Sequence, residues 1–249
     1  MKKLIYIWII GLLFACNGDN VPDCFQNAGD IIEQEFEVSS FTKITVNPRI
    51  ELILTQAPTQ QVIVQTGEYL MPDIDVRVED GRLNLFNDNV CNLTRNYGVT
   101  KVFVSAPNIT EIRNGSSFTV SSMGVLNYEN LRLVSEDFDN EDELVTTGNF
   151  DVEVDCESLN IVVNNLSSVF ISGTVESMFV GYYSGDARFE GRDLIAQDVE
   201  IFQRSSNDMI INAQQSITGE IRSTGDVILV QTPTVVDVQQ FYTGQLIYE

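Results

Sequence analysis

The chain has 249 residues, 36 acidic and 14 basic side chains, no histidine, and a formal net charge of −22 at pH 7. This balance excludes nucleic acid as an expected partner, because phosphate binding needs clustered cations. The absence of histidine excludes Ser-His-Asp and Cys-His nucleophiles and histidine metal sites. The length fits one elongated domain.

Residues 1–15 have the layout of a secretory signal peptide, with a basic start, an apolar run from Leu4 to Phe14 and a small residue before Cys16. The run is too short to span a bilayer as a helix. Leu13-Phe14-Ala15-Cys16 resembles the bacterial lipoprotein box, in which the cysteine becomes the lipidated first residue. We therefore expect a lipid anchor at Cys16 and a place in the cell envelope, at the outer membrane. The alternative is an ordinary signal peptide in which Cys16 is incidental.

Residues 16–37 are expected to form a tether and a lead-in, and the first third of the domain that follows contains short alternating strands. These strands cover residues 35–46, 50–54 and 61–64. Asp80-Gly81 lies between two further strands and is typical of a two-residue type I′ hairpin. Because hairpins are antiparallel, this part predicts β elaborations that precede a regular repeat.

A unit of about 20 residues recurs between Leu144 and Val230, in which a small polar turn leads into an alternating strand. Even spacing of this kind is typical of a β-solenoid, because a single coil cannot bury its inward side chains alone. We predict stacked parallel coils over residues 115–230. Their inward positions should include Phe150, Val152, Val154, Phe170 and Phe189. An antiparallel sandwich is the alternative.

Four segments resemble the head GIN domain family of auto-transporter adhesins, which is found in lipoproteins of Bacteroidota. They are Phe41–Val46, Ile50–Gln56, Val76–Leu83 and Val102–Pro107. The resemblance covers about residues 38–230 and implies an all-β fold, a right-handed parallel β-helix with N-terminal elaborations. The domain is accordingly expected at residues 38–249. The family's motifs describe strands and turns, so the resemblance transfers no catalytic residue.

Three cysteines remain after Cys16. Lead-in segments of the family carry a cysteine pair, so the resemblance implies a disulfide between Cys24 and Cys91. Cys156 lies in Val152-Glu-Val154-Asp-Cys156, where alternation predicts a buried thiol. Zinc is not expected, because the cysteine spacing is wrong and no histidine assists. No cofactor is predicted.

Two groups of carboxylates are candidates for chemistry. The run from Glu136 to Glu143 supplies oxygen ligands for calcium, but it lacks the glycine-bearing spacing of a calcium loop and reads more simply as a solvated insertion. Asp186, Asp208 and Asp226 recur near turns, where they could serve a β-helix enzyme that acts on polysaccharide. The competing interpretation is that they close Asx-type turns.

Two classes of function therefore remain. The favoured one is a non-catalytic, adhesin-like binding or scaffolding module on a lipid anchor, with a surface glycan or protein as its partner. The other is a carbohydrate-active β-helix enzyme. Absent histidine and scarce lysine favour the first class, because they remove the most common proton shuttles and amine nucleophiles.

Overall fold

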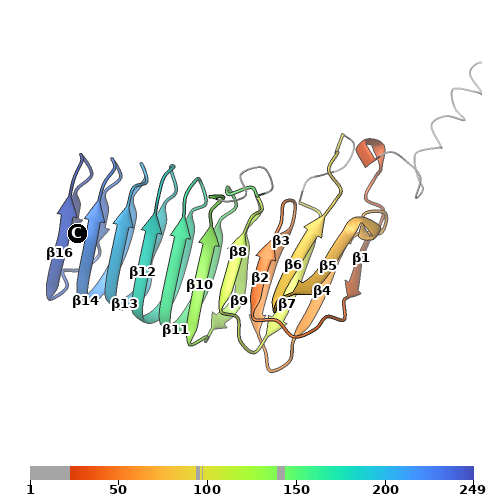
Figure 1. Ribbon diagram of the computed structural model, residues 1–249, viewed down its shortest axis with the longest axis horizontal. Helices are drawn as coiled ribbons and strands as arrows, with labels where there is room; N and C mark the ends of the chain where they lie inside the picture. The colour runs from red at the N-terminus through yellow and green to blue at the C-terminus, as the bar shows by residue number, and fades with distance from the viewer. Residues whose placement is uncertain (1–22, 94–95, 97, 139–143) are drawn as a thin grey trace, which may run out of the picture.

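The computed structural model describes residues 23–93, 96, 98–138 and 144–249. In this part the chain is all β, with two 3-10 turns, η1 (Asp23–Phe25) and η2 (Met71–Asp73), and no α-helix. None of its helices is long and apolar enough to cross a membrane. Figure 1 shows strands stacked side by side into an elongated body, with the N-terminal strands at one end and the C-terminus at the other.

The strands form two rows. The first row runs in the order β1 (Ile31–Glu35), β4 (Gln61–Gly67), β7 (Lys101–Ala106), β3 (Glu51–Gln56), β9 (Val120–Leu126), the first halves of β11 to β14, β15 (Val227–Leu229) and β17 (Leu246–Tyr248). The second row consists of β5 (Ile74–Glu79), β6 (Arg82–Asn87), β2 (Lys43–Val46), β8 (Glu111–Asn114), β10 (Asn130–Ser135), the second halves of β11 to β14, and β16 (Val235–Gln240).

Four long strands belong to both rows, namely β11 (Phe150–Val163), β12 (Val169–Tyr182), β13 (Phe189–Gln203) and β14 (Met209–Ile221). The first half of β11 pairs with β9 and its second half with β10, so the strand passes from one row to the other. Successive units then pair in parallel, Phe150 with Val169, Val169 with Phe189, and Phe189 with Met209. The predicted parallel pairing of repeat units is confirmed, and an antiparallel sandwich is wrong for this region.

The N-terminal part departs from sequence order. Strands β2 and β3 pair in parallel with β6 and β7 on one side and with β8 and β9 on the other. The unit formed by β2 and β3, the first of these pairs in the sequence, therefore lies between two units that come later in the sequence. Among the residues that the structure describes, antiparallel pairing is confined to β1–β4, β4–β7 and the β5–β6 hairpin. The hairpin turns at Asp80 (φ 49°) and Gly81 (φ 72°), as the type I′ signal predicts.

Apolar side chains from both rows form one core. Four of the five predicted inward residues are 0–3% exposed, namely Phe150, Val152, Val154 and Phe189. Phe170 was wrongly predicted, since it is 39% exposed and lies on the outer face. Val169 pairs with Phe150 and takes the inward position, and a shift of one residue along a strand moves a side chain to the other face.

Close backbone stacking leads to a prediction about Gly219, which has φ +127° and lies so near the preceding unit that a Cβ would come within 2.0 Å of the Ile201 carbonyl oxygen. We expect Gly219→Ala to lower the free energy of unfolding by about 3 kcal/mol. Gly124 also has positive φ but no atom within 4 Å of its Cβ position. Gly124→Ala should cost only about 1–2 kcal/mol. Urea denaturation measures both, and equal losses would contradict the close approach.

Candidate recognition face on the second row

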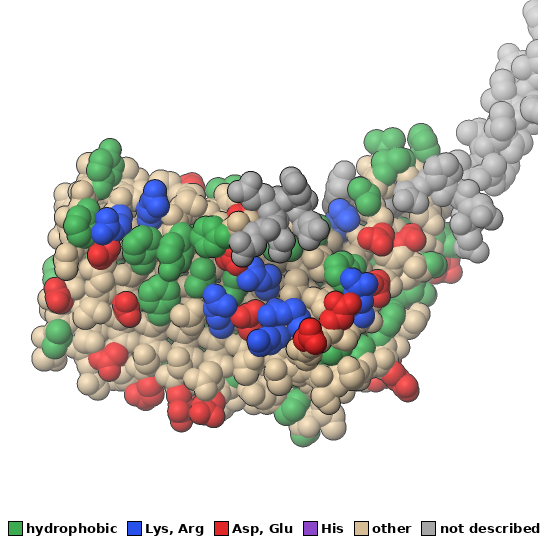
Figure 2. Space-filling view, in the orientation of Figure 1, with side chains coloured by type: hydrophobic (Ala, Val, Ile, Leu, Met, Phe, Trp, Pro, Cys, Tyr) green, Lys and Arg blue, Asp and Glu red, His purple; other side chains and the backbone are tan. Residues whose placement is uncertain are grey.

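The outer face of the second row carries ladders of side chains from successive strands. Parallel register places Lys43 beside Glu111, Glu111 beside Arg132, and Asn160 beside Phe179. Neighbouring strands lie about 4.8 Å apart, so each side chain contacts the ones above and below it. On this face, basic side chains gather in the middle of the molecule and apolar ones lie beside them (Figure 2).

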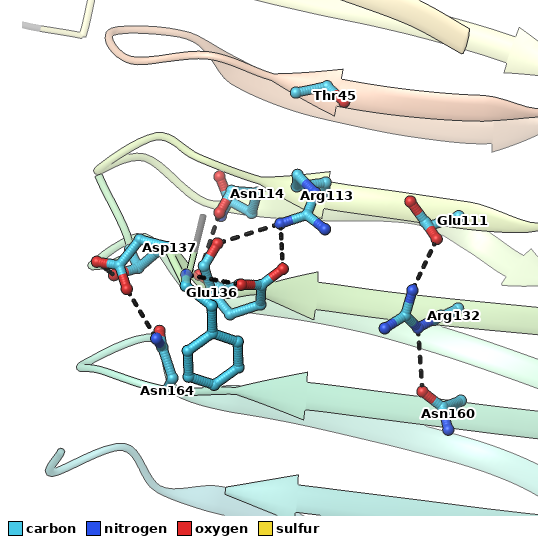
Figure 3. Close-up of polar contacts among 12 residues, drawn as sticks. Thr45, Glu111, Arg113, Asn114, Arg132, Glu136, Asp137, Asn160 and Asn164 are labelled. Carbon is cyan, nitrogen blue, oxygen red and sulfur yellow. Dashed lines mark hydrogen bonds and ion pairs between the residues drawn. The ribbon is translucent and has the colours of Figure 1, made fainter. Parts of the chain in front are cut away.

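Glu111 is the centre of the basic group. Its side chain is 11% exposed and accepts a hydrogen bond from Arg82 Nη2 at 2.6 Å and another from Arg132 Nη1 at 3.0 Å. Arg132 Nε also donates to Asn160 Oδ1 at 3.3 Å, which extends the network to β11 (Figure 3). Burial alone would raise the pKa of Glu111, but the hydrogen bonds and charges of Arg82 and Arg132 outweigh it and lower the pKa below its ordinary value.

A second ion pair lies next to this network. Arg113 Nη1 contacts Glu136 Oε1 at 2.5 Å and also donates to the Glu136 backbone carbonyl (Figure 3). Both side chains are largely buried, at 23% and 13% exposure. The carboxylates of Glu111 and Glu136 are thus each paired with arginine side chains.

A shallow groove of about 500 Å³ lies further along the same face, across the second halves of β12, β13 and β14 and across β16. The rings of Phe179, Tyr183 and Phe202 line it together with Glu200 and Glu220. The ring centroids of Tyr183 and Phe202 are 5.0 Å apart, and the ring of Phe138 meets Tyr183 edge-on at 5.9 Å. Half-buried rings beside hydrogen-bonding groups make this groove a candidate for ligand contact.

The turn aspartates accept hydrogen bonds from neighbouring units. Asp208 Oδ1 accepts the backbone N–H of Asp226 at 3.0 Å, and Asp226 Oδ1 accepts that of Gln245 at 2.8 Å. Asn149 accepts the N–H of Ser168 in the same way. Asp186 is offset from this ladder, since its Oδ1 accepts a hydrogen bond from the Ser206 hydroxyl. Asp208 and Asp226 thus satisfy backbone donors of the next unit, whereas the Asx-type turn that the sequence suggested would have closed locally, on the N–H two residues further on.

The cysteines divide as the sequence analysis expects. Cys24 and Cys91 form a disulfide with an S–S distance of 2.03 Å, and the Leu93 N–H donates to the Cys24 carbonyl beside it. Cys156 is a free thiol that is 5% exposed. Burial raises its pKa to about 11, which keeps it protonated and unreactive near neutral pH.

The remaining candidate residues fall partly outside the described residues. Cys16 and the signal peptide at residues 1–15 lie outside them, as do residues 139–143 of the acidic run. At the start of that run, Asp137 accepts hydrogen bonds from Asn164 Nδ2 at 2.7 Å and Asn165 Nδ2 at 3.2 Å. Within the described ranges, no group of three or more Cys, Asp or Glu side chains is arranged to hold a metal ion.

Comparison with known proteins agrees with this all-β architecture. The model of the family described as "Putative auto-transporter adhesin, head GIN domain" matches residues 40–233. This match spans most of the chain, and the chain belongs to that family. No curated protein matches.

Several solved structures share the fold. A "putative adhesin" from Bacteroides fragilis has a TM-score of 0.79 at 21% identity, with 90% of this chain and 99% of that chain covered. A "putative lipid binding protein" from Parabacteroides distasonis has a TM-score of 0.66 at 14% identity, covering 89% and 97%. A "putative adhesin" from Parabacteroides merdae has 0.62 at 13% identity, with the same coverage. At such identities the likeness extends to the fold alone.

Glu111 generates a prediction about pH. Its lowered pKa means that the ionised side chain stabilises the folded state above its unfolded pKa, and that this contribution disappears as pH falls through the folded pKa. We expect Glu111→Gln to lower the free energy of unfolding by about 1–2 kcal/mol at pH 7.

The deficit should shrink as pH falls below the unfolded pKa and through the lowered folded pKa, because the wild-type carboxyl then becomes protonated. Urea titrations of both proteins across this range measure it. Glu51→Gln is the matched control, because Glu51 pairs with Lys101 at 3.1 Å in a more exposed position and should cost less. A deficit at position 111 that does not change with pH would contradict the role of the ionised carboxylate.

Proposed function

We propose that this protein is a lipid-anchored, non-catalytic recognition module of the cell envelope. In this proposal residues 1–15 are the signal peptide, Cys16 carries the lipid, residues 17–37 lead into the domain, and residues 38–249 wind as a right-handed parallel β-helix. The parallel pairing of successive units supports the winding, and parallel β connections are almost always right-handed. Membership of the adhesin family supports a surface or envelope location.

The groove lined by Phe179, Tyr183 and Phe202 is the observation that carries the proposal. Its rings offer flat apolar surface, and Glu200 and Glu220 line it as hydrogen-bond acceptors, of which Glu220 is paired with Arg222. Sugar rings combine an apolar face with a rim of hydroxyl groups, so this pairing of groups suits a surface glycan. The groove is open and runs across several strands, which favours an extended chain over a small enclosed molecule.

Non-catalytic action is supported by the hydrogen bonds of the turn aspartates. Polysaccharide cleavage of the usual kind needs two carboxyl groups with pKa values pushed apart on either side of one bond. Asp208 and Asp226 instead accept backbone N–H groups of the following unit, and Asp186 lies out of line with them. We therefore assign these side chains to hydrogen bonding between successive units.

The proposed anchor gives a direct prediction. With Cys16 intact, the protein should sediment with membranes and release an N-terminal peptide that carries acyl chains. Cys16→Ala should move it into the soluble fraction, because each buried CH₂ of an acyl chain contributes about 0.8 kcal/mol to membrane binding. Fractionation followed by mass spectrometry measures this. Mature protein in which Cys16 carries no acyl chain would refute the lipid anchor. The proposal for the groove is tested separately.

The groove gives a second prediction, tested on an array of neutral and acidic bacterial polysaccharides. We expect saturable binding without turnover, weakened at least tenfold in Phe202→Ala, since a central aromatic anchor contributes more than about 1 kcal/mol. Phe170→Ala is the matched control, because it removes an exposed phenylalanine from the first row. Equal effects of the two substitutions would contradict the location of the site.

The same polysaccharides separate the two classes of function. Reducing-end assays on wild type and on Asp186→Asn, Asp208→Asn and Asp226→Asn should show no turnover in any of them. Turnover by the wild type that is lost in one folded variant would make the protein an enzyme and overturn the non-catalytic assignment.

A further inference from the structure

The two ends of the stack differ in how the apolar core is covered. At the N-terminal end the core is covered, because Val62 and Val64 on β4 are 0% exposed, and Leu70, Met71 and Ile74 are 3–7% exposed. The edge strand beyond them, β1, exposes Ile31 and Ile32 but also carries Glu33 and Glu35 among its five residues. Charged side chains on an edge strand are a common protection against pairing with another chain.

At the C-terminal end the last inward-facing side chains are partly exposed to solvent. Ile217 and Leu229 are 0% exposed, and each pairs with a residue of the next unit, Val236 and Tyr248. Those two side chains therefore point the same way as the core but are 37% and 49% exposed. Terminal units of repeat proteins usually carry a polar outer face that closes the apolar column. Here apolar inward positions reach the surface.

The strands at this end are also unpaired on one side. Strand β16 pairs with β14, and β17 pairs with β15; no strand of the described residues pairs with their other edges. Residues 231–249 contain no basic residue and only two acidic ones, Asp237 and Glu249. Glu249 is neutralised by Arg192, whose Nη1 lies 2.5 Å from its carboxylate.

We propose that this end is an interface at which two copies of the chain meet, C-terminal end to C-terminal end. The low charge of this end favours a second copy of the chain as its partner. Two chains of net charge −22 repel each other, and the repulsion is weakest where few charged side chains face each other. The contact covers Val236, Val238, Leu246 and Tyr248 of both copies and continues the two rows of strands across the junction.

The assembly closes at two copies. A head-to-tail stack would bring the C-terminal strands against β1, and the carboxylates of Glu33 and Glu35 on that edge would have to lose their water. The same patch therefore meets itself across a two-fold axis, which makes a closed dimer rather than a fibre. A strand that meets its own copy in this way runs antiparallel to it and satisfies the free N–H and C=O groups of the edge.

The test is the mass of the particle in solution, measured by sedimentation and light scattering over a wide concentration range on the chain from residue 17 onward. Because this chain lacks Cys16 and no glycan is added, the measured mass does not depend on the lipid anchor or on glycan binding. The wild type should form a dimer, and the dimer should strengthen with salt, because salt screens the repulsion between acidic bodies but not the apolar contact.

Val236→Glu combined with Val238→Glu should weaken the dimer at least about 100-fold, because the contact would bury unpaired charges. Ile195→Glu is the control, since Ile195 is 44% exposed in the middle of the stack and its substitution should leave the dimer unchanged. The proposal would be overturned if the wild type stays monomeric or forms particles larger than two copies. It would also be overturned if Ile195→Glu weakens the dimer as much as the double substitution at Val236 and Val238.

Hydrogen exchange on the wild type provides a test that needs no variant. Amides of β16 and β17 should be protected at high protein concentration and exposed on dilution, while those of β12 stay protected throughout. Concentration-independent exchange in β16 and β17 would also overturn the proposal.

Discussion

Hydrogen bonding between parallel strands in register is the constraint on which this structure depends. It places each residue directly beside its equivalents in the neighbouring units, Phe150 beside Val169 and Val169 beside Phe189. Inward positions then merge into one apolar core, and no unit could bury its side chains without its neighbours. The same spacing brings backbones so close at Gly173 and Gly219 that a Cβ would meet a carbonyl oxygen within 2.0 Å.

Register also decides how charge can be arranged on the outside. Side chains at equivalent positions contact each other along the whole stack, so like charges there would repel at the strand spacing. Glu111 lies between Lys43 and Arg132, and its carboxylate joins Arg82 to Arg132. A strongly acidic chain thus gathers several of its few cations where the N-terminal units meet the regular repeat.

The two rows give the molecule long flanks and shallow grooves instead of a deep cleft. Extended recognition needs only side chains that are repeated along such a surface. Phe179, Tyr183 and Phe202 provide such a set across β12 and β13. Polar turn residues, which might have suggested catalysis, are used to connect one unit to the next.

Local patterns in the sequence determined a good deal. Two-residue alternation predicted the buried side of β11, Asp80-Gly81 predicted the hairpin, and the repeat length predicted parallel units, since each of these depends on neighbours along the chain. Alternation also placed Cys156 inside. The disulfide between Cys24 and Cys91 was expected from the family resemblance alone.

Only the tertiary structure decided what depends on register between distant segments. Phe170 was predicted on the wrong face because Val169 is the residue that pairs with Phe150, and a difference of one residue in register moves a side chain to the other face. The insertion of β2 and β3 between later units, and with it the meeting of Lys43, Glu111 and Arg132, has no signal in local sequence. Which end of the core is covered was likewise decided by packing, because β4, η2 and β5 cover one end while Val236 and Tyr248 reach the surface at the other.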